Sequence, residues 1–151
     1  MIRRLLATGV LVISLVLAIS PAEATKAGSA SVSLIAQSPW IADDGDLALD
    51  LRITGAVDEA RLVLQLHRAI DRRSLLALWD GIPDSPLGNP VEIPITEVRN
   101  SAGVASLVLQ VGTEGRLESR PGGVYPLSVT LVDDQERLLD RLTTPLVHLP
   151  V

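Results

Sequence analysis

The side chains that most often act as nucleophiles, bases or soft metal ligands are scarce in this chain, which has two histidines and no cysteine. His67 and His148 stand far apart in the sequence, and neither belongs to a metal-binding pattern with a second histidine nearby. No serine lies in a G-x-S-x-G turn, which would expose its hydroxyl as a nucleophile. Both histidines are therefore predicted to have structural or surface roles.

The acidic side chains are more numerous, but their spacing does not suit paired acid and base catalysis or a cation site. Glu92 and Glu97 are five residues apart on a predicted strand, and alternation would turn them to opposite faces. The acidic turns at residues 43–46 and 133–136 each offer too few of the roughly six to eight oxygen ligands that Ca²⁺ takes. We predict no catalytic, metal-binding or cofactor-binding residue.

The one local basic cluster consists of Arg68, Arg72 and Arg73. Such a cluster suits an anionic glycopolymer or a lipid head group, and the alternative is a solvated loop. Arg72 and Arg73 lie in a long connection at residues 69–90, in which residues 74–81 are predicted to form one or two helical turns. Trp79 on that helix either closes one end of the core as a lid or stays partly exposed beside Arg72 and Arg73. In the second case these three residues form a partner contact.

The elements that position these side chains are predicted to be short strands. Apolar stretches of period two are separated by clusters of Gly, Pro, Asp and Asn, and no long helical stripe is present. Seven strands are predicted, at residues 31–37, 47–54, 61–67, 91–98, 103–112, 124–132 and 138–149. Residues 82–90 are predicted to form a surface loop because of their three prolines. Seven short strands at such spacings are typical of an antiparallel β-sandwich.

The first 24 residues have the three parts of a signal peptide. Arg3 and Arg4 precede an apolar run at residues 5–19, and Ala22 and Ala24 flank Glu23 in a small-x-small cleavage site. The alternative is an uncleaved anchor, but the apolar run is shorter than the roughly 20 residues that span a membrane. We predict a signal peptide at residues 1–24, a flexible lead-in at 25–30 and one domain at 31–150. The protein is then secreted or extracytoplasmic, and it contacts a membrane only through the N-terminal segment if that segment is uncleaved.

The composition restricts both the core and the partners. Of 151 residues, none is Phe, two are Trp and one is Tyr, so the core must consist of Leu, Val and Ile. The net charge of −5 at pH 7 argues against nucleic acid as a partner.

The segment at residues 121–129, with its Gly123-x-Tyr125 spacing, resembles the start of the sixth strand of immunoglobulin-like and fibronectin type III-like domains. The resemblance puts Tyr125 at the tyrosine corner, where the hydroxyl bonds a backbone group upstream. Leu127 takes the place of the second disulfide cysteine of antibody domains. The resemblance implies the immunoglobulin/fibronectin III-like type. With the strand pattern, the helical turns at 74–81 and the leader, we predict an all-β antiparallel β-sandwich of that type, with about seven strands and one short helix, preceded by a signal-peptide helix.

A second resemblance extends over most of the chain after residue 24. The sequence is similar to the N-terminal immunoglobulin-like domain of a family of actinobacterial extracytoplasmic proteins of unknown function. The residues that carry it are Ser38-Pro39, Gly45, His67-Arg68, Ser74-Leu75-Leu76, residues 123–127 and residues 144–150. The resemblance implies a cell-envelope setting and no assigned chemistry. Longer members continue into further domains and a C-terminal membrane helix, whereas this sequence ends at Val151.

These observations favour a secreted, non-catalytic module that binds an unknown envelope protein or polymer through its loops or an edge strand. The alternative is a small carbohydrate-active or other hydrolytic accessory enzyme. Three aromatic residues scattered along the chain make a poor stacking platform for sugars. A concave cleft that holds two carboxylates would favour the enzyme.

Overall fold

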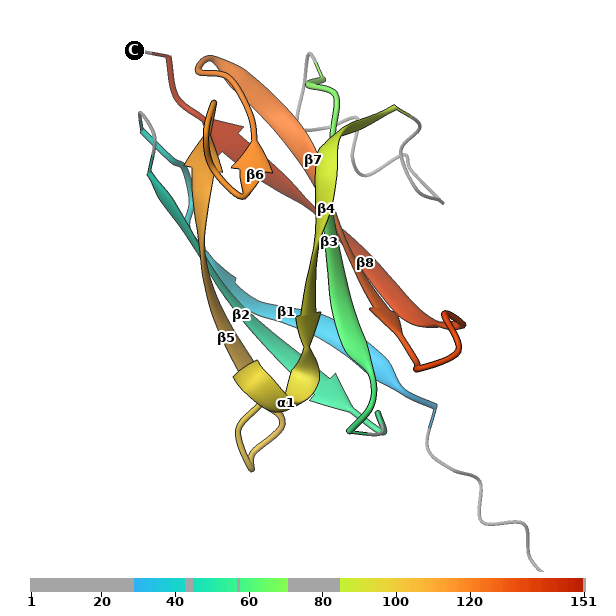
Figure 1. Ribbon diagram of the computed structural model, residues 1–151. Helices are drawn as coiled ribbons and strands as arrows, with labels where there is room; N and C mark the ends of the chain where they lie inside the picture. Colours follow the sequence, from blue (N-terminus) through green and yellow to red (C-terminus); the bar gives the residue numbers. More distant parts are fainter. Residues whose placement is uncertain (1–28, 43–44, 57, 71–84, 151) are drawn as a thin grey trace, which may run out of the picture.

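The computed structural model of the chain describes residues 29–42, 45–56, 58–70 and 85–150, which form an all-β sandwich of two sheets (Figure 1). The first sheet has the order β1-β2-β5-β6, with β1 (Ser31–Gln37), β2 (Asp46–Thr54), β5 (Val104–Gly112) and β6 (Leu117–Glu118). The second has the order β4-β3-β7-β8, with β4 (Pro86–Pro94), β3 (Arg61–His67), β7 (Gly123–Val132) and β8 (Leu138–His148). All paired strands are antiparallel except β5 and β6.

The core between the two sheets is aliphatic, as the composition predicts. Alternate residues of β2 from Leu47 to Ile53 are buried, and alternate residues of β3 from Leu62 to Leu66 belong to the same hydrophobic cluster. Tyr125 is the one aromatic side chain in this cluster among the described residues. Each fully buried Leu or Ile stabilises the fold by about 1.5–3 kcal/mol. The core can therefore hold the ends of the strands in place without a disulfide.

Two predictions for residues 82–98 are wrong. The predicted loop already contains strand β4, which begins at Pro86, and the predicted strand at 91–98 ends at Pro94. Proline is tolerated in β4 because this strand lies at the edge of its sheet and pairs only with β3. After Pro94 the chain forms the single helical turn α1 (Ile95–Val98), in which Arg99 N donates to Ile95 O at 2.8 Å. Ile95 is buried, so it continued the period-two pattern that resembled a strand.

The first strand leaves its sheet at Ser38-Pro39 and joins the other one. Pairing of β1 with β2 ends at Gln37, where the sequence predicts an interruption by proline. Ile41 then forms a parallel bridge with His148 at the end of β8. Ile41 N donates to Val147 O, and Leu149 N donates to Ile41 O, both at 2.8 Å. This crossing closes one side of the sandwich.

Several predicted features lie outside the described residues. These are the leader with Ala22 and Ala24, most of the lead-in at 25–30, and the helix at 74–81 with Arg72, Arg73 and Trp79. Within the described ranges, no helix is both long and apolar enough to cross a membrane.

Candidate functional site

Tyr125 stands at the start of β7 and is buried. Its hydroxyl donates to Arg120 O at 2.8 Å and accepts from Arg120 N at 3.0 Å, so it satisfies both backbone groups of one residue. Gly123 is two residues earlier on the same strand face. A Cβ at that position would lie 2.7 Å from Tyr125 Cζ and 2.8 Å from its hydroxyl oxygen, which is too close for real atoms. The ring therefore requires a glycine there, which gives the Gly-x-Tyr spacing a steric cause.

A cavity of about 360 Å³ lies beside Tyr125, and we call it the end cavity. Its lining comes from four separate segments of the chain: Arg68, Ala69, Leu87, Glu118, Ser119, Arg120 and Tyr125. The end of β3 and the starts of β4 and β7 meet β6 at this end of the sandwich, at the top of Figure 1. Ser119 and Tyr125 are buried, whereas the charged residues are exposed. The end cavity thus has a buried floor and a charged rim.

The rim carries two guanidinium groups and one carboxylate. Among the described residues, none of the ion pairs includes Arg68, Arg120 or Glu118. Arg68 belongs to the predicted basic cluster, whose other members, Arg72 and Arg73, lie outside the described residues. Arg120 and Glu118 were missed because they are some fifty residues further along the chain and belong to no local motif. Only the pairing of the strands brings them to Arg68.

Each histidine forms a buried hydrogen bond with a serine. His67 Nε2 lies 2.9 Å from Ser128 Oγ, and His148 Nδ1 lies 2.8 Å from Ser119 Oγ. A serine hydrogen-bonded to a histidine is one arrangement that activates a nucleophile. The exposed fraction of Ser119 is 0%, however, so this hydroxyl is closed to an external substrate. Each histidine–serine hydrogen bond links two chain segments that are distant in the sequence but adjacent in the fold.

The expectation that Glu92 and Glu97 lie on opposite faces of one strand is wrong. Glu92 is in β4 and Glu97 is in α1, and both line a groove of about 190 Å³ between β4 and β5. The strand ends at Pro94, so the alternation on which the prediction rested does not reach Glu97. Glu92 accepts from Arg61 Nε at 3.0 Å, which ties this carboxylate to an ion pair.

The second acidic turn, at residues 133–136, is built around a buried carboxylate. Asp133 Oδ1 accepts from the backbone N–H groups of Gln135 and Arg137 at 2.9 and 2.8 Å, and Oδ2 accepts from Arg137 Nε at 2.7 Å. Burial acts to raise the pKa of Asp133, but the hydrogen bonds and charge of Arg137, with the bond from Gln135, outweigh it and lower the pKa. Through these bonds the Asp133 carboxylate stabilises the turn between β7 and β8. Asp43 and Asp44 of the first acidic turn lie outside the described residues.

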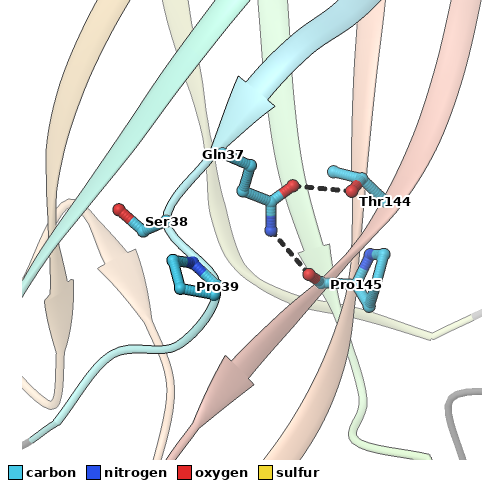
Figure 2. A pocket seen from close by; sticks show the side chains of 5 residues that line it. All are labelled: Gln37, Ser38, Pro39, Thr144 and Pro145. Atoms are coloured by element: carbon cyan, nitrogen blue, oxygen red, sulfur yellow. Dashed lines mark hydrogen bonds between the residues drawn. The ribbon is translucent and has the colours of Figure 1, made fainter.

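A small notch lies where β1 crosses to β8, and Figure 2 shows its lining. It has a volume of about 180 Å³ and is lined by Gln37, Ser38, Pro39, Thr144 and Pro145. The Gln37 amide points toward β8, where its Nε2 donates to Pro145 O and its Oε1 accepts from Thr144 Oγ1, both at 2.6 Å. These bonds join the two sheets at the point where β1 crosses to β8.

Trp40 directly follows the notch in the chain. It is 59% exposed, and Leu149 is 37% exposed. Ile41 and His148 pair with their side chains buried, so alternation places their neighbours Trp40 and Leu149 on the outer face. We call Trp40, Leu149 and the notch residues the seam surface. No sequence pattern predicts this surface, because only the crossing of β1 turns Trp40 outward.

A comparison with protein-family models finds no match, and a comparison with curated proteins finds no significant relative.

Proposed function

We propose that the chain is a secreted or extracytoplasmic, non-catalytic module of immunoglobulin/fibronectin III-like type that binds an envelope protein or polymer. The seam surface is its contact with that partner. The exposed position of Trp40 is the observation that carries the proposal. Tryptophan is enriched among the residues that contribute most to binding, and a largely solvated indole gains by being covered.

The strand connectivity supports the immunoglobulin-like part of the proposal. Without the two-residue β6, the first, second and fifth long strands share one sheet, and the third, sixth and seventh share the other. The corresponding strands of immunoglobulin domains are divided in the same way. The fourth long strand, β4, pairs with β3, which is a departure from antibody constant domains within the same architecture. The bonds from Tyr125 to Arg120 are of the kind made by a tyrosine corner.

The structure of the seam favours a rigid contact surface. The hydrogen bonds of Gln37 fix β1 to β8 on one side of Trp40, and those of Ile41 fix it on the other. Binding therefore orders little backbone, and the entropy cost of association is correspondingly small. The position in the cell envelope rests on the signal-peptide pattern of residues 1–24 and on the resemblance to actinobacterial extracytoplasmic proteins.

The proposal is tested by substituting the exposed indole. The exported protein and its Trp40→Ala variant are sedimented with an insoluble actinobacterial envelope fraction, and the bound fraction is measured against protein concentration. We expect the variant to melt like the parent but to bind at least about tenfold more weakly, as for a residue central to an interface. Val108→Ala is the matched control, because Val108 is apolar and 69% exposed but lies on β5, away from the seam. If Trp40→Ala binds like the parent, the seam is not the contact.

The alternative, a hydrolytic accessory enzyme, is favoured by one observation: Glu92 and Glu97 line the same groove. Glycosidases use two carboxylates on either side of the scissile bond. Release of sugars from envelope polysaccharide, measured for the parent and for Glu97→Gln, tests it. If the parent hydrolyses the polysaccharide and the variant does not, the chain is an enzyme rather than a binding module.

A further inference from the structure

The end cavity has the features of a binding site that is separate from the seam surface. Its volume of about 360 Å³ is at the lower end of the range for small-molecule pockets. Partly buried Leu87 and the edge of the Tyr125 ring form its accessible floor, whereas Ser119 beside them is closed to solvent. A small organic group would replace water against this floor, while its charged ends would reach the rim.

The backbone that carries the charged rim side chains is held in place by neighbouring groups. Both backbone polar groups of Arg120 are bonded by the Tyr125 hydroxyl, and Arg68 N donates to Ser85 O at 3.1 Å. Glu118 lies against Gly88, where an added Cβ would come within 3.2 Å of Glu118 Cβ and 3.3 Å of its Oε2. The φ of Gly88 is 65°, a conformation that favours glycine. The absence of a side chain at Gly88 therefore leaves the space that Glu118 occupies.

The charges of the rim define the chemistry of a ligand. Guanidinium groups bind carboxylates and phosphates through strong charge-assisted hydrogen bonds. Arg68 and Arg120 supply two such groups, and neither forms an ion pair with a described residue. Glu118 adds one carboxylate that likewise has no ion-pair partner among the described residues. A simple anion would meet repulsion from Glu118, whereas a ligand that also carries a cation would use all three groups.

We propose that the end cavity binds a small zwitterion with one carboxylate and one ammonium group, such as a free amino acid. The carboxylate lies between Arg68 and Arg120, and the ammonium group lies at Glu118. The apolar part of the ligand covers Leu87 and the edge of the Tyr125 ring. This assignment is independent of the seam surface, because the two sets of lining residues share no member.

Titration of the exported protein with L-alanine tests the proposal, followed through the backbone amide NMR signals of Ser119 and Arg120. Acetate and methylammonium, which each carry half of the alanine charge pattern, are titrated in parallel. We expect alanine to shift these signals and to bind at least about tenfold more tightly than either half. Arg120→Gln and Arg68→Gln should each weaken alanine binding by roughly tenfold or more, the loss expected for one charge-assisted hydrogen bond.

Glu118→Gln separates a zwitterion site from a simple anion site. This substitution should weaken alanine binding and strengthen acetate binding, because it removes a partner of the ammonium group and a source of repulsion for the anion. Arg52→Gln is the matched control, since Arg52 is exposed and forms no ion pair among the described residues. It pairs with Val104 at the start of β5, whereas β6 pairs with the end of β5 at the end cavity. Acetate binding as tight as alanine binding, or no alanine-dependent shift at Ser119 and Arg120, would overturn the proposal.

Discussion

At the scale of single residues, the Gly123-x-Tyr125 pair shows how a short sequence motif becomes a structural constraint. The ring of Tyr125 occupies the space that any side chain at residue 123 would need, and its hydroxyl satisfies the backbone of Arg120. The spacing of two follows from strand alternation, which places both residues on one face. The same tyrosine forms part of the floor of the end cavity, so the corner shapes the proposed zwitterion site.

A double-mutant cycle tests this steric coupling. Tyr125→Ala should lower the free energy of unfolding by about 3 kcal/mol or more, as for other buried aromatic truncations. Gly123→Ala in the parent should cost about 1–3 kcal/mol, because the new Cβ overlaps the ring. In the Tyr125→Ala background the same glycine substitution should cost little, which denaturant unfolding of the four proteins measures. Equal costs of Gly123→Ala in both backgrounds would show that the ring is not what excludes a side chain.

Asp133 predicts how stability depends on pH. Its pKa in the folded protein is lowered from the usual 3.8, so its contribution to stability is fully present above pH 3.8 and is lost as the pH falls through the folded-state pKa. The melting temperature of the parent should therefore exceed that of Asp133→Asn at neutral pH, and the difference should shrink as the pH falls below 3.8. A difference that stays constant down to pH 2 would mean that the ionised carboxylate does not stabilise the turn.

At the scale of elements, the sequence predicted strands well where burial alternates and poorly where another factor dominates. The predicted strand at 61–67 matches β3 because Leu62, Leu64 and Leu66 point into the core. Strand β4 was missed at its start because prolines are poor strand residues in general but are tolerated at a sheet edge. The turn α1 was missed because buried Ile95 continues a period-two pattern.

The candidate site was harder to predict than the strands. The end cavity assembles Arg68, Glu118 and Arg120 from segments that no local motif connects, and only Arg68 stood out in the sequence. Trp40 becomes exposed because β1 crosses from β2 to β8, which depends on pairing across more than a hundred residues. The predicted contacts at Arg72, Arg73 and Trp79 stay predictions, as do both roles of Trp79, as a lid or as an anchor.

Gln37 tests how firmly β1 is held at the seam. Gln37→Ala removes two hydrogen bonds to β8 and should lower the free energy of unfolding by about 1–3 kcal/mol. Amide hydrogen exchange should accelerate in β1 and remain unchanged in β3, because the loss is local to the seam. Gln110→Ala is the control, since Gln110 is exposed on β5 and forms no side-chain hydrogen bond with a described residue. Unchanged exchange in β1 would show that other contacts hold the strand.

At the scale of the whole molecule, the fold separates the two surfaces for which we propose different binding partners. The seam surface offers an exposed indole to a large partner, whereas the end cavity offers charges to a small ligand. One aliphatic core packs between the strands that carry both surfaces. The separation means that Trp40→Ala and Arg120→Gln should each affect one kind of binding and leave the other unchanged.

The proposed setting in the cell envelope depends on export. We expect the mature chain to begin near Thr25, after cleavage at Ala24, because a small-x-small site follows the apolar run. Mass spectrometry of the extracytoplasmic protein measures the N-terminus. An intact Met1 would place the protein on the membrane through its N-terminal segment.

The proposed function requires that Trp40 is covered when the module binds its partner. In the Trp79→Phe variant Trp40 is the sole tryptophan, so its fluorescence reports on the seam surface alone. We expect red-shifted emission that acrylamide quenches readily in the free protein, since Trp40 is 59% exposed. On binding to the envelope fraction, the emission should shift to the blue and become protected from acrylamide. If the emission and quenching of Trp40 in the bound protein equal those in the free protein, the seam surface is not the contact.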